Sequence, residues 1–116
     1  MNDIGVCYLN LEQPEKAEPY FRKAVAADDV FVMPRINLAA ILFAAQNVPE
    51  AEQQYRRCLK LEPHQIEAKI GLASCLASQG QLKPAIALFE EVLLTHPNRK
   101  DVQQNLDMAR GMLKSQ

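Results

Sequence analysis

The sequence has no tryptophan, only four glycines, and an aromatic content of 6% over 116 residues. Because glycine is scarce and apolar residues make up 48% of the chain, collagen-like structure and overall disorder are excluded. The chain has enough apolar residues to form a buried core. Ala, Leu, Glu, Gln and Lys dominate instead, and these residues favour helices. The composition therefore predicts one helical domain of ordinary size.

The chain also lacks an excess of charge and a long apolar run. Its 13 Lys and Arg residues nearly balance 14 Asp and Glu residues, so electrostatics gives no reason to bind a phosphate backbone or an anionic lipid. The longest apolar run, Leu38–Ala45, is far shorter than the roughly 20 residues that span a bilayer, and no basic segment precedes an apolar stretch near Met1. We expect no nucleic-acid partner and no membrane insertion.

Residues that carry chemistry are few and scattered. Cys7, Cys58 and Cys75 show no Cys-x-x-Cys spacing, which indicates reduced core thiols and favours the cytoplasm, with an oxidised Cys58–Cys75 pair as the alternative. His64 and His96 are single residues beside prolines, and no activated nucleophile or glycine-rich phosphate loop is present. We therefore expect no enzymatic activity, no cofactor and no bound metal.

The main positive feature is an internal repeat, because the chain matches itself at a shift of 34 residues without any insertion. Each matched column holds residues of one size class. The columns are Ile4, Leu38, Leu72 and Leu106; Gly5, Ala39 and Ala73; Tyr8, Leu42 and Leu76; Ala17, Ala51 and Ala85; Phe21, Tyr55 and Phe89; Pro63 and Pro97.

Each repeat is predicted to contain two amphipathic helices joined by a tight turn. Apolar residues recur at spacings of three and four over 36–45 and again over 51–59, and the segment 46–49 (Gln-Asn-Val-Pro) interrupts them. Gly80 marks the same turn one repeat later, and Pro63 stops the second helix of its repeat.

This pattern resembles the tetratricopeptide repeat family, in which an apolar residue followed by a small one, then Tyr, Ala, Phe and Pro, recur in every unit. The column of the family's tryptophan is occupied here by Met1, Arg35 and Lys69, and Asp29 replaces the proline of the first unit. The resemblance implies an all-α fold, a right-handed α-solenoid of about three helix-turn-helix units with a capping helix at the C-terminus.

The repeat register divides the single domain, residues 1–116, into four parts. Unit one (1–31) lacks its opening residues, units two (32–65) and three (66–99) are complete, and residues 100–116 form the capping helix. The incomplete first unit favours a chain taken from a longer repeat array.

The resemblance implies that the first helices of the units line a concave groove. Met33, Ile36, Ala40 and Phe43 follow one another at spacings of three, four and three, on a different side of their helix from Leu38. A solvent-exposed apolar stripe of this size predicts a docking groove, although ordinary core covered by neighbouring helices remains the alternative. The candidate groove residues are Val6, Leu9, Met33, Ile36, Asn37, Ala40, Phe43, Ile70, Ser74 and Met108.

The resulting hypothesis is a non-enzymatic protein–protein interaction scaffold that binds an apolar peptide or helix of a partner. Two alternatives remain: a homodimer formed through the uncovered first helix around Ile4 and Tyr8, and a docking segment of a larger multidomain protein.

Some members of the family clamp the acidic C-terminal tails of chaperones with lysine, asparagine and arginine side chains. The corresponding positions here are Asn2, Val6, Asn37, Glu67 and Gly71. Only Asn37 agrees and Glu67 reverses the sign of the charge, so we expect that this chain is not a chaperone acidic-tail clamp.

Overall fold

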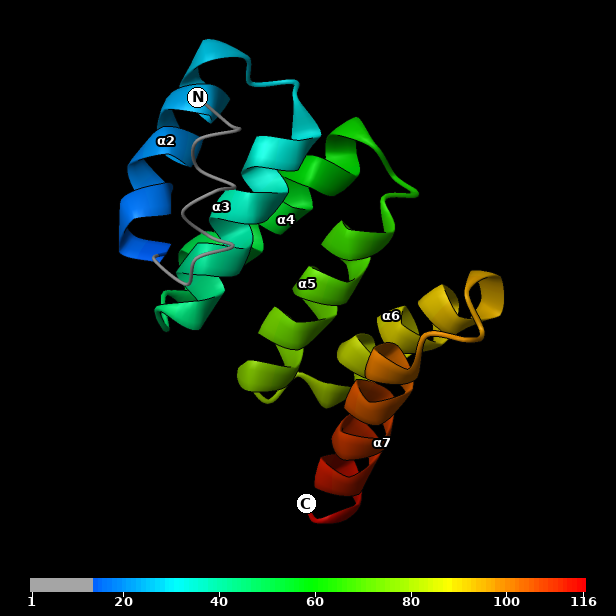
Figure 1. Ribbon diagram of the computed structural model, residues 1–116. Coiled ribbons are helices and arrows are strands. Elements are labelled where there is room, and N and C mark those ends of the chain that lie inside the picture. The colour runs from blue at the N-terminus through cyan, green and yellow to red at the C-terminus, as the bar shows by residue number, and fades with distance from the viewer. Residues whose placement is uncertain (1–13) are drawn as a thin grey trace.

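The computed structural model describes residues 14–116, and this part of the chain is helical and contains no strand. Its helices are α2 (Pro14–Ala27), α3 (Val32–Ala44), α4 (Val48–Leu61), α5 (Ile66–Ser78), α6 (Leu82–Thr95) and α7 (Lys100–Lys114) (Figure 1). The predicted all-α fold of paired helices is confirmed. The helix expected around Ile4 and Tyr8 lies outside the described residues.

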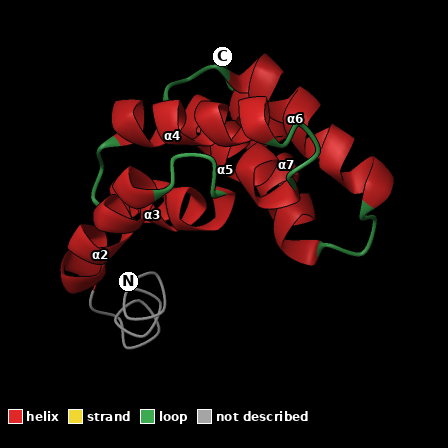
Figure 2. Cartoon of the chain, turned by 90° about the horizontal axis from the view of Figure 1, so that it is seen from above, coloured by secondary structure: helices red, strands yellow, loops and turns green. Residues whose placement is uncertain are grey.

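The helices stack in chain order, each packing on the next, and they follow an arc with principal extents of 43, 25 and 24 Å (Figure 2). In addition α3 packs on α5, and α5 packs on α7, whereas no comparable packing joins α4 to α6. The first helices of successive units are therefore drawn together on the inner side of the arc. This is the arrangement of an α-solenoid.

The repeat columns form the core between the helices. The small residues Ala17, Ala51 and Ala85 are 0% exposed, and the large residues four positions later, Phe21, Tyr55 and Phe89, are at most 5% exposed. An alanine lets a neighbouring helix approach closely, and the aromatic ring one turn later fills the remaining space. Each large side chain that is buried in this way contributes roughly 1.5–3 kcal/mol.

The turn inside each unit is built the same way twice. Gln46 has φ of 70° and Gly80 has φ of 79°, which places both in the left-handed region. Behind them, the backbone N–H of Asn47 donates to the carbonyl of Leu42 at 2.8 Å, and the N–H of Gln81 donates to that of Leu76 at 2.9 Å. These are the hydrogen bonds of a Schellman motif, which satisfies the last carbonyls of α3 and α5 and reverses the chain.

The second helices end where the sequence predicts. α4 stops at Leu61 and α6 stops at Thr95, each two residues before a proline. The first helices α3, α5 and α7 begin at residues 32, 66 and 100. The division of residues 1–116 into one domain with three units and a capping helix stays a prediction.

Two charged side chains are buried between the helices of their units, in the column where the family carries tryptophan. Arg35 and Lys69 are each 8% exposed. Arg35 donates to the Gln54 side chain at 2.7 Å and to the Asp29 carbonyl at 3.1 Å, while Lys69 pairs with Glu91 at 2.7 Å. Their aliphatic stems fill space as an indole would, and the charged ends bind the neighbouring helix.

Candidate functional site

A groove runs across the inner helices of the arc. Its first half is a hollow of about 360 Å³ between α3 and α5, lined by Met33, Ile36, Asn37, Ala40, Phe43, Tyr55, Glu67, Ile70, Gly71 and Ser74. Its second half is a hollow of about 400 Å³ towards α7, lined by Phe43, Ser74, Ala77, Ser78, Phe89, Asn105, Met108, Ala109 and Met112. Because Phe43 and Ser74 line both hollows, we treat them as one surface and call it the groove.

The structure brings most of the predicted groove residues together. Seven of them line the first hollow: Met33, Ile36, Asn37, Ala40, Phe43, Ile70 and Ser74. Met108 lines the second hollow. Val6 and Leu9 lie outside the described residues.

The sequence analysis missed Asn105 and Met112, although the sequence contains a signal for each of these groove residues. Asn105 stands two repeats after Asn37 in the same column, and Met112 follows Met108 by one helical turn, so both share a face with a predicted residue. Tyr55, by contrast, belongs to a core column, and the periodicity of its own helix gives no sign that it reaches the groove.

The predicted apolar stripe on α3 is not exposed along its whole length. Met33 is 44% exposed, but Ile36 is only 7% exposed and belongs to the hydrophobic core. The expectation of solvent exposure is wrong at Ile36, whose side chain packs into the core, whereas Ala40 on the same stripe is exposed and Phe43 is half-buried. Large exposed apolar side chains of the groove are Met33 and, on α7, Met108 (65%) and Met112 (48%).

Tyr55 forms part of the groove wall because Gly71 has no side chain. A Cβ atom placed on Gly71 would overlap the ring carbons of Tyr55. The ring therefore lies directly against α5, where it is 5% exposed, and burial raises the pKa of its hydroxyl. A tyrosine from α4 thus reaches the wall of the first half of the groove, whose other lining residues lie on α3 and α5.

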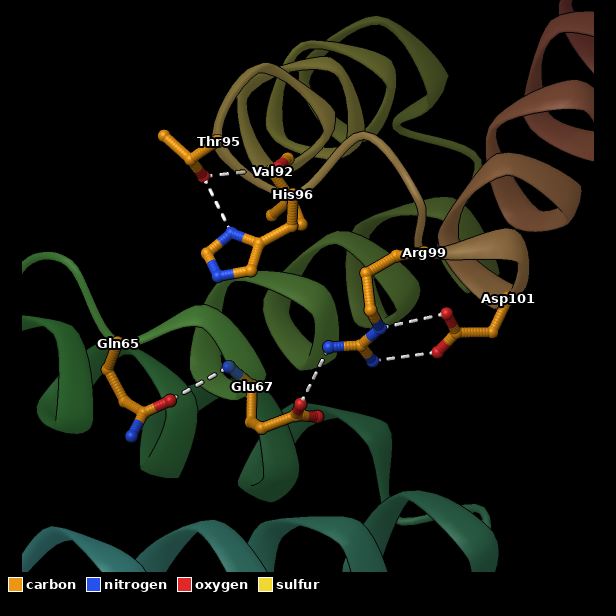
Figure 3. A network of polar contacts seen from close by, with 7 residues as sticks. All are labelled: Gln65, Glu67, Val92, Thr95, His96, Arg99 and Asp101. Atoms are coloured by element: carbon orange, nitrogen blue, oxygen red, sulfur yellow. Dashed lines mark hydrogen bonds and ion pairs between the residues drawn. The ribbon is translucent and has the colours of Figure 1, made fainter.

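A cluster of three charges stands at one edge of the groove, where α5 and α7 begin (Figure 3). Arg99 donates to Asp101 through two nitrogens, at 3.0 and 2.8 Å, and through the third to Glu67 at 3.1 Å. The guanidinium lowers the pKa of the Asp101 carboxyl. Two carboxylates share one cation, so the cluster keeps a net charge of −1.

Glu67 is held in place by its own helix start. The Gln65 side chain accepts a hydrogen bond from the Glu67 backbone N–H at 2.8 Å, which caps α5 (Figure 3). A carboxylate in the first turn also interacts favourably with the helix dipole.

Three further observations concern residues 14–116 outside the groove. Cys58 and Cys75 are buried free thiols, and burial raises the pKa of each to about 11. In residues 14–116, no three His, Cys, Asp or Glu side chains come together in a way that could hold a metal ion. Nor is any helix there both long enough and apolar enough to cross a membrane.

Sequence comparison decides the family. A family model described as "Tetratricopeptide repeat" matches residues 42–106, and a second one with the same description matches residues 1–30. The chain belongs to the tetratricopeptide repeat family. No curated protein matches this tetratricopeptide chain.

Solved tetratricopeptide structures have the same fold. The first TPR domain of human RPAP3 superposes with a TM-score of 0.90 at 20% identity, covering 98% of this chain and 90% of that one. The first TPR of Spaghetti (RPAP3), bound to the HSP90 peptide SRMEEVD, gives 0.91 at 19% identity, covering 97% and 90%. The second TPR domain of human RPAP3, in complex with the HSP70 peptide SGPTIEEVD, gives 0.83 at 24% identity, covering 93% and 90%.

Proposed function

We propose that this tetratricopeptide chain is a non-enzymatic protein–protein interaction scaffold whose groove binds an apolar peptide or helix of a partner. The observation that carries the proposal is a continuous groove across α3, α5 and α7 with exposed apolar side chains at both ends. Concave apolar surface of this kind is typical of sites that accept a segment of another protein.

The lining suits a segment of variable shape. Met33 lines the first half of the groove, and Met108 and Met112 line the second half. Methionine is unbranched and polarizable, so it adapts to different apolar partners. Asn37 and Asn105, in the same repeat column, provide side-chain amides that can donate to and accept from a partner's backbone.

An acidic C-terminal tail is not the segment that we expect here, although two of the structural neighbours carry HSP90 and HSP70 peptides. Glu67 places a carboxylate in the groove where the family's clamp has a cation. A peptide carboxylate would be repelled there, and Gly71 offers no side chain in place of the second cation.

The experiment begins with affinity selection of displayed random twelve-residue peptides on the immobilised protein. A selected peptide is then titrated by fluorescence anisotropy. We expect enrichment of Leu, Ile, Met and Phe. We also expect the double variant Met33→Glu with Met108→Glu to bind at least about tenfold more weakly, because two apolar contacts worth roughly 1 kcal/mol each are replaced by charges.

Leu94→Glu is the matched control. Leu94 is 84% exposed on α6 and lines neither half of the groove, so the same apolar-to-acidic change should leave affinity unchanged. Both variants should keep the helical circular dichroism spectrum, since the altered side chains are exposed. Ile36 is avoided because a glutamate at a buried position would unfold the chain. Equal affinity of the double variant and the parent would contradict the proposal.

A further inference from the structure

The inference here rests on the proposed function and specifies the chemistry of the bound segment. We propose that this segment carries a lysine or arginine among its apolar residues, and that the basic side chain pairs with the acidic edge formed by Glu67 and Asp101.

Glu67 is the only charged residue among the described residues that line the groove. All other lining side chains are apolar or neutral, so the sign of the charge in the groove is set by this one carboxylate and by its immediate neighbours. A segment that lies in the groove therefore meets negative charge at a single place, the start of α5.

The neighbours of Glu67 do not cancel that charge. Arg99 already donates through its three nitrogens, two of them to Asp101 and one to Glu67 Oε1. Within residues 14–116 no hydrogen bond or ion pair engages Glu67 Oε2. The Glu67 and Asp101 side chains are 53% and 59% exposed, whereas Arg99 is 33% exposed. The two carboxylates flank the guanidinium (Figure 3) and expose more of their side chains than Arg99 does.

The position of the acidic edge also determines how apolar and basic residues must be arranged in the bound segment. Glu67 and Asp101 stand in the first turns of α5 and α7, while Phe43, Ala77 and Met112 stand near the last turns of their helices. A segment that crosses α5 and α7 therefore has acid along one side and apolar surface along the other, while the start of α3 carries the apolar Met33. Apolar residues on one side and a basic residue on the other side match this arrangement.

The test uses synthetic peptides of twelve residues made from leucine, alanine and serine. A single lysine, glutamine or glutamate is placed at each position in turn, and every peptide is titrated against the full chain by fluorescence anisotropy. At one or more positions we expect lysine to bind about threefold to fivefold more tightly than glutamine, and glutamate more weakly, which is the scale of an exposed ion pair. The preference should disappear in about 1 M salt, where the Debye length is about 3 Å.

Two variants locate the effect. Glu67→Gln should abolish the preference for lysine, and Glu67→Lys should reverse it. The control is Glu90→Gln, because Glu90 is 49% exposed and pairs with Arg110 at 2.6 Å outside the groove, so it resembles Glu67 in exposure and in having an arginine partner. The control should keep the preference of the parent.

Three results would overturn the inference, and they are distinguishable. Equal affinity of the lysine, glutamine and glutamate peptides at every position would mean that the groove recognises only apolar residues. The proposed function would then stand without this inference. Tighter binding of glutamate would show instead that Arg99 captures an acidic segment. Absence of saturable binding by every peptide would contradict the proposed function itself.

Discussion

At the scale of single residues, Gly71 shows how a missing side chain shapes the groove. Glycine normally weakens a helix, since the unfolded chain gains conformational freedom at that position. Here the lost Cβ makes room for the Tyr55 ring, which then forms part of the groove wall. The residue is therefore expected to be retained for packing against α4 rather than for the conformation of α5.

A pair of glycine substitutions tests this reading. Gly71→Ala should lower the free energy of unfolding by about 1–3 kcal/mol, the usual cost of overpacking, despite the higher helix propensity of alanine. Gly111→Ala is the control, because Gly111 lies in α7 with open space around the position of a Cβ atom. It should raise stability by about 0.5 kcal/mol. Urea unfolding curves measure both, and a stabilised Gly71→Ala variant would contradict the packing argument.

Ile36 marks where single-residue reasoning from the sequence ends. Helical periodicity places Met33, Ile36 and Phe43 on one face of α3, and all three do line the groove. How deeply each is buried depends on the neighbouring helices, which leave Met33 exposed and cover Ile36. The face was predictable because it follows from 3.6 residues per turn, whereas the depth was not, because it follows from the curvature of the stack.

At the scale of elements, the turns after α3 and α5 share one backbone conformation but not one residue. Both turns need a residue with positive φ, which an L-amino acid adopts at a cost and glycine adopts freely. Gly80 adopts this conformation freely, whereas Gln46 in the equivalent position adopts it at a conformational cost. The turn of unit two is thus stabilised, despite an unfavourable residue, by two Schellman hydrogen bonds: Asn47 N–H donates to the Leu42 carbonyl and Gln46 N–H to the Phe43 carbonyl at 3.0 Å.

Exchanging the two residues should have opposite effects. Gln46→Gly should stabilise the fold by about 0.5–1 kcal/mol, because relief of strain outweighs the added freedom of the unfolded chain. Gly80→Gln should destabilise it by a similar amount. No atom approaches a Cβ at Gly80, so the expected loss is conformational rather than steric. Thermal midpoints of the two variants decide the matter; shifts in the same direction would exclude this account of the turns.

Within each unit, other side chains occupy the position at which the family carries tryptophan. Arg35 and Lys69 replace the tryptophan of the family pattern and stay buried because Gln54 and Glu91, on the second helices, receive their charged ends. Sequence reasoning recognised the departure from the family. It did not find these partners, since they are 19 and 22 residues away along the chain and come from different repeat columns.

At the scale of the whole molecule, three buried groups link stability to pH. Burial raises the pKa of Cys58 and Cys75 from 9.0 to about 11 and also raises the pKa of Tyr55. Below pH 9 these groups are protonated in both the folded and the unfolded chain. Above pH 9 the unfolded chain releases thiol protons that the folded chain still holds, so unfolding becomes more favourable.

Stability should therefore fall between pH 9 and pH 11, by on the order of 2 kcal/mol for each thiol. Urea midpoints measured at pH 7.5, 9 and 10.5 follow this loss. The double variant Cys58→Ala with Cys75→Ala is the comparison, because it removes both thiols while leaving Tyr55 and the lysines in place. Its stability should depend less steeply on pH than that of the parent. An identical pH dependence would show that the thiols do not contribute.

The groove itself exists only at the scale of the whole molecule. α3, α5 and α7 each contribute part of its surface, and no single unit contains both Met33 and Met108. Repeat proteins make their binding surfaces in this way, since each unit contacts only its neighbours and the stack bends as a whole. Family membership was predictable from the repeat columns, and the inner position of the first helices was implied by the resemblance to the family.

The sequence by itself determined the period of 34 residues, the helices, the turns between them, and the small and large columns of the core, because these depend on local geometry repeated along the chain. Only the tertiary structure decided that Arg99 holds Glu67 and Asp101 together, that Tyr55 reaches the groove past Gly71, and that Ile36 is covered. Each of these depends on the distance between different helices, such as α4 and α5 for Tyr55 and Gly71. That distance is set by packing over the whole arc, which periodicity along one helix does not contain.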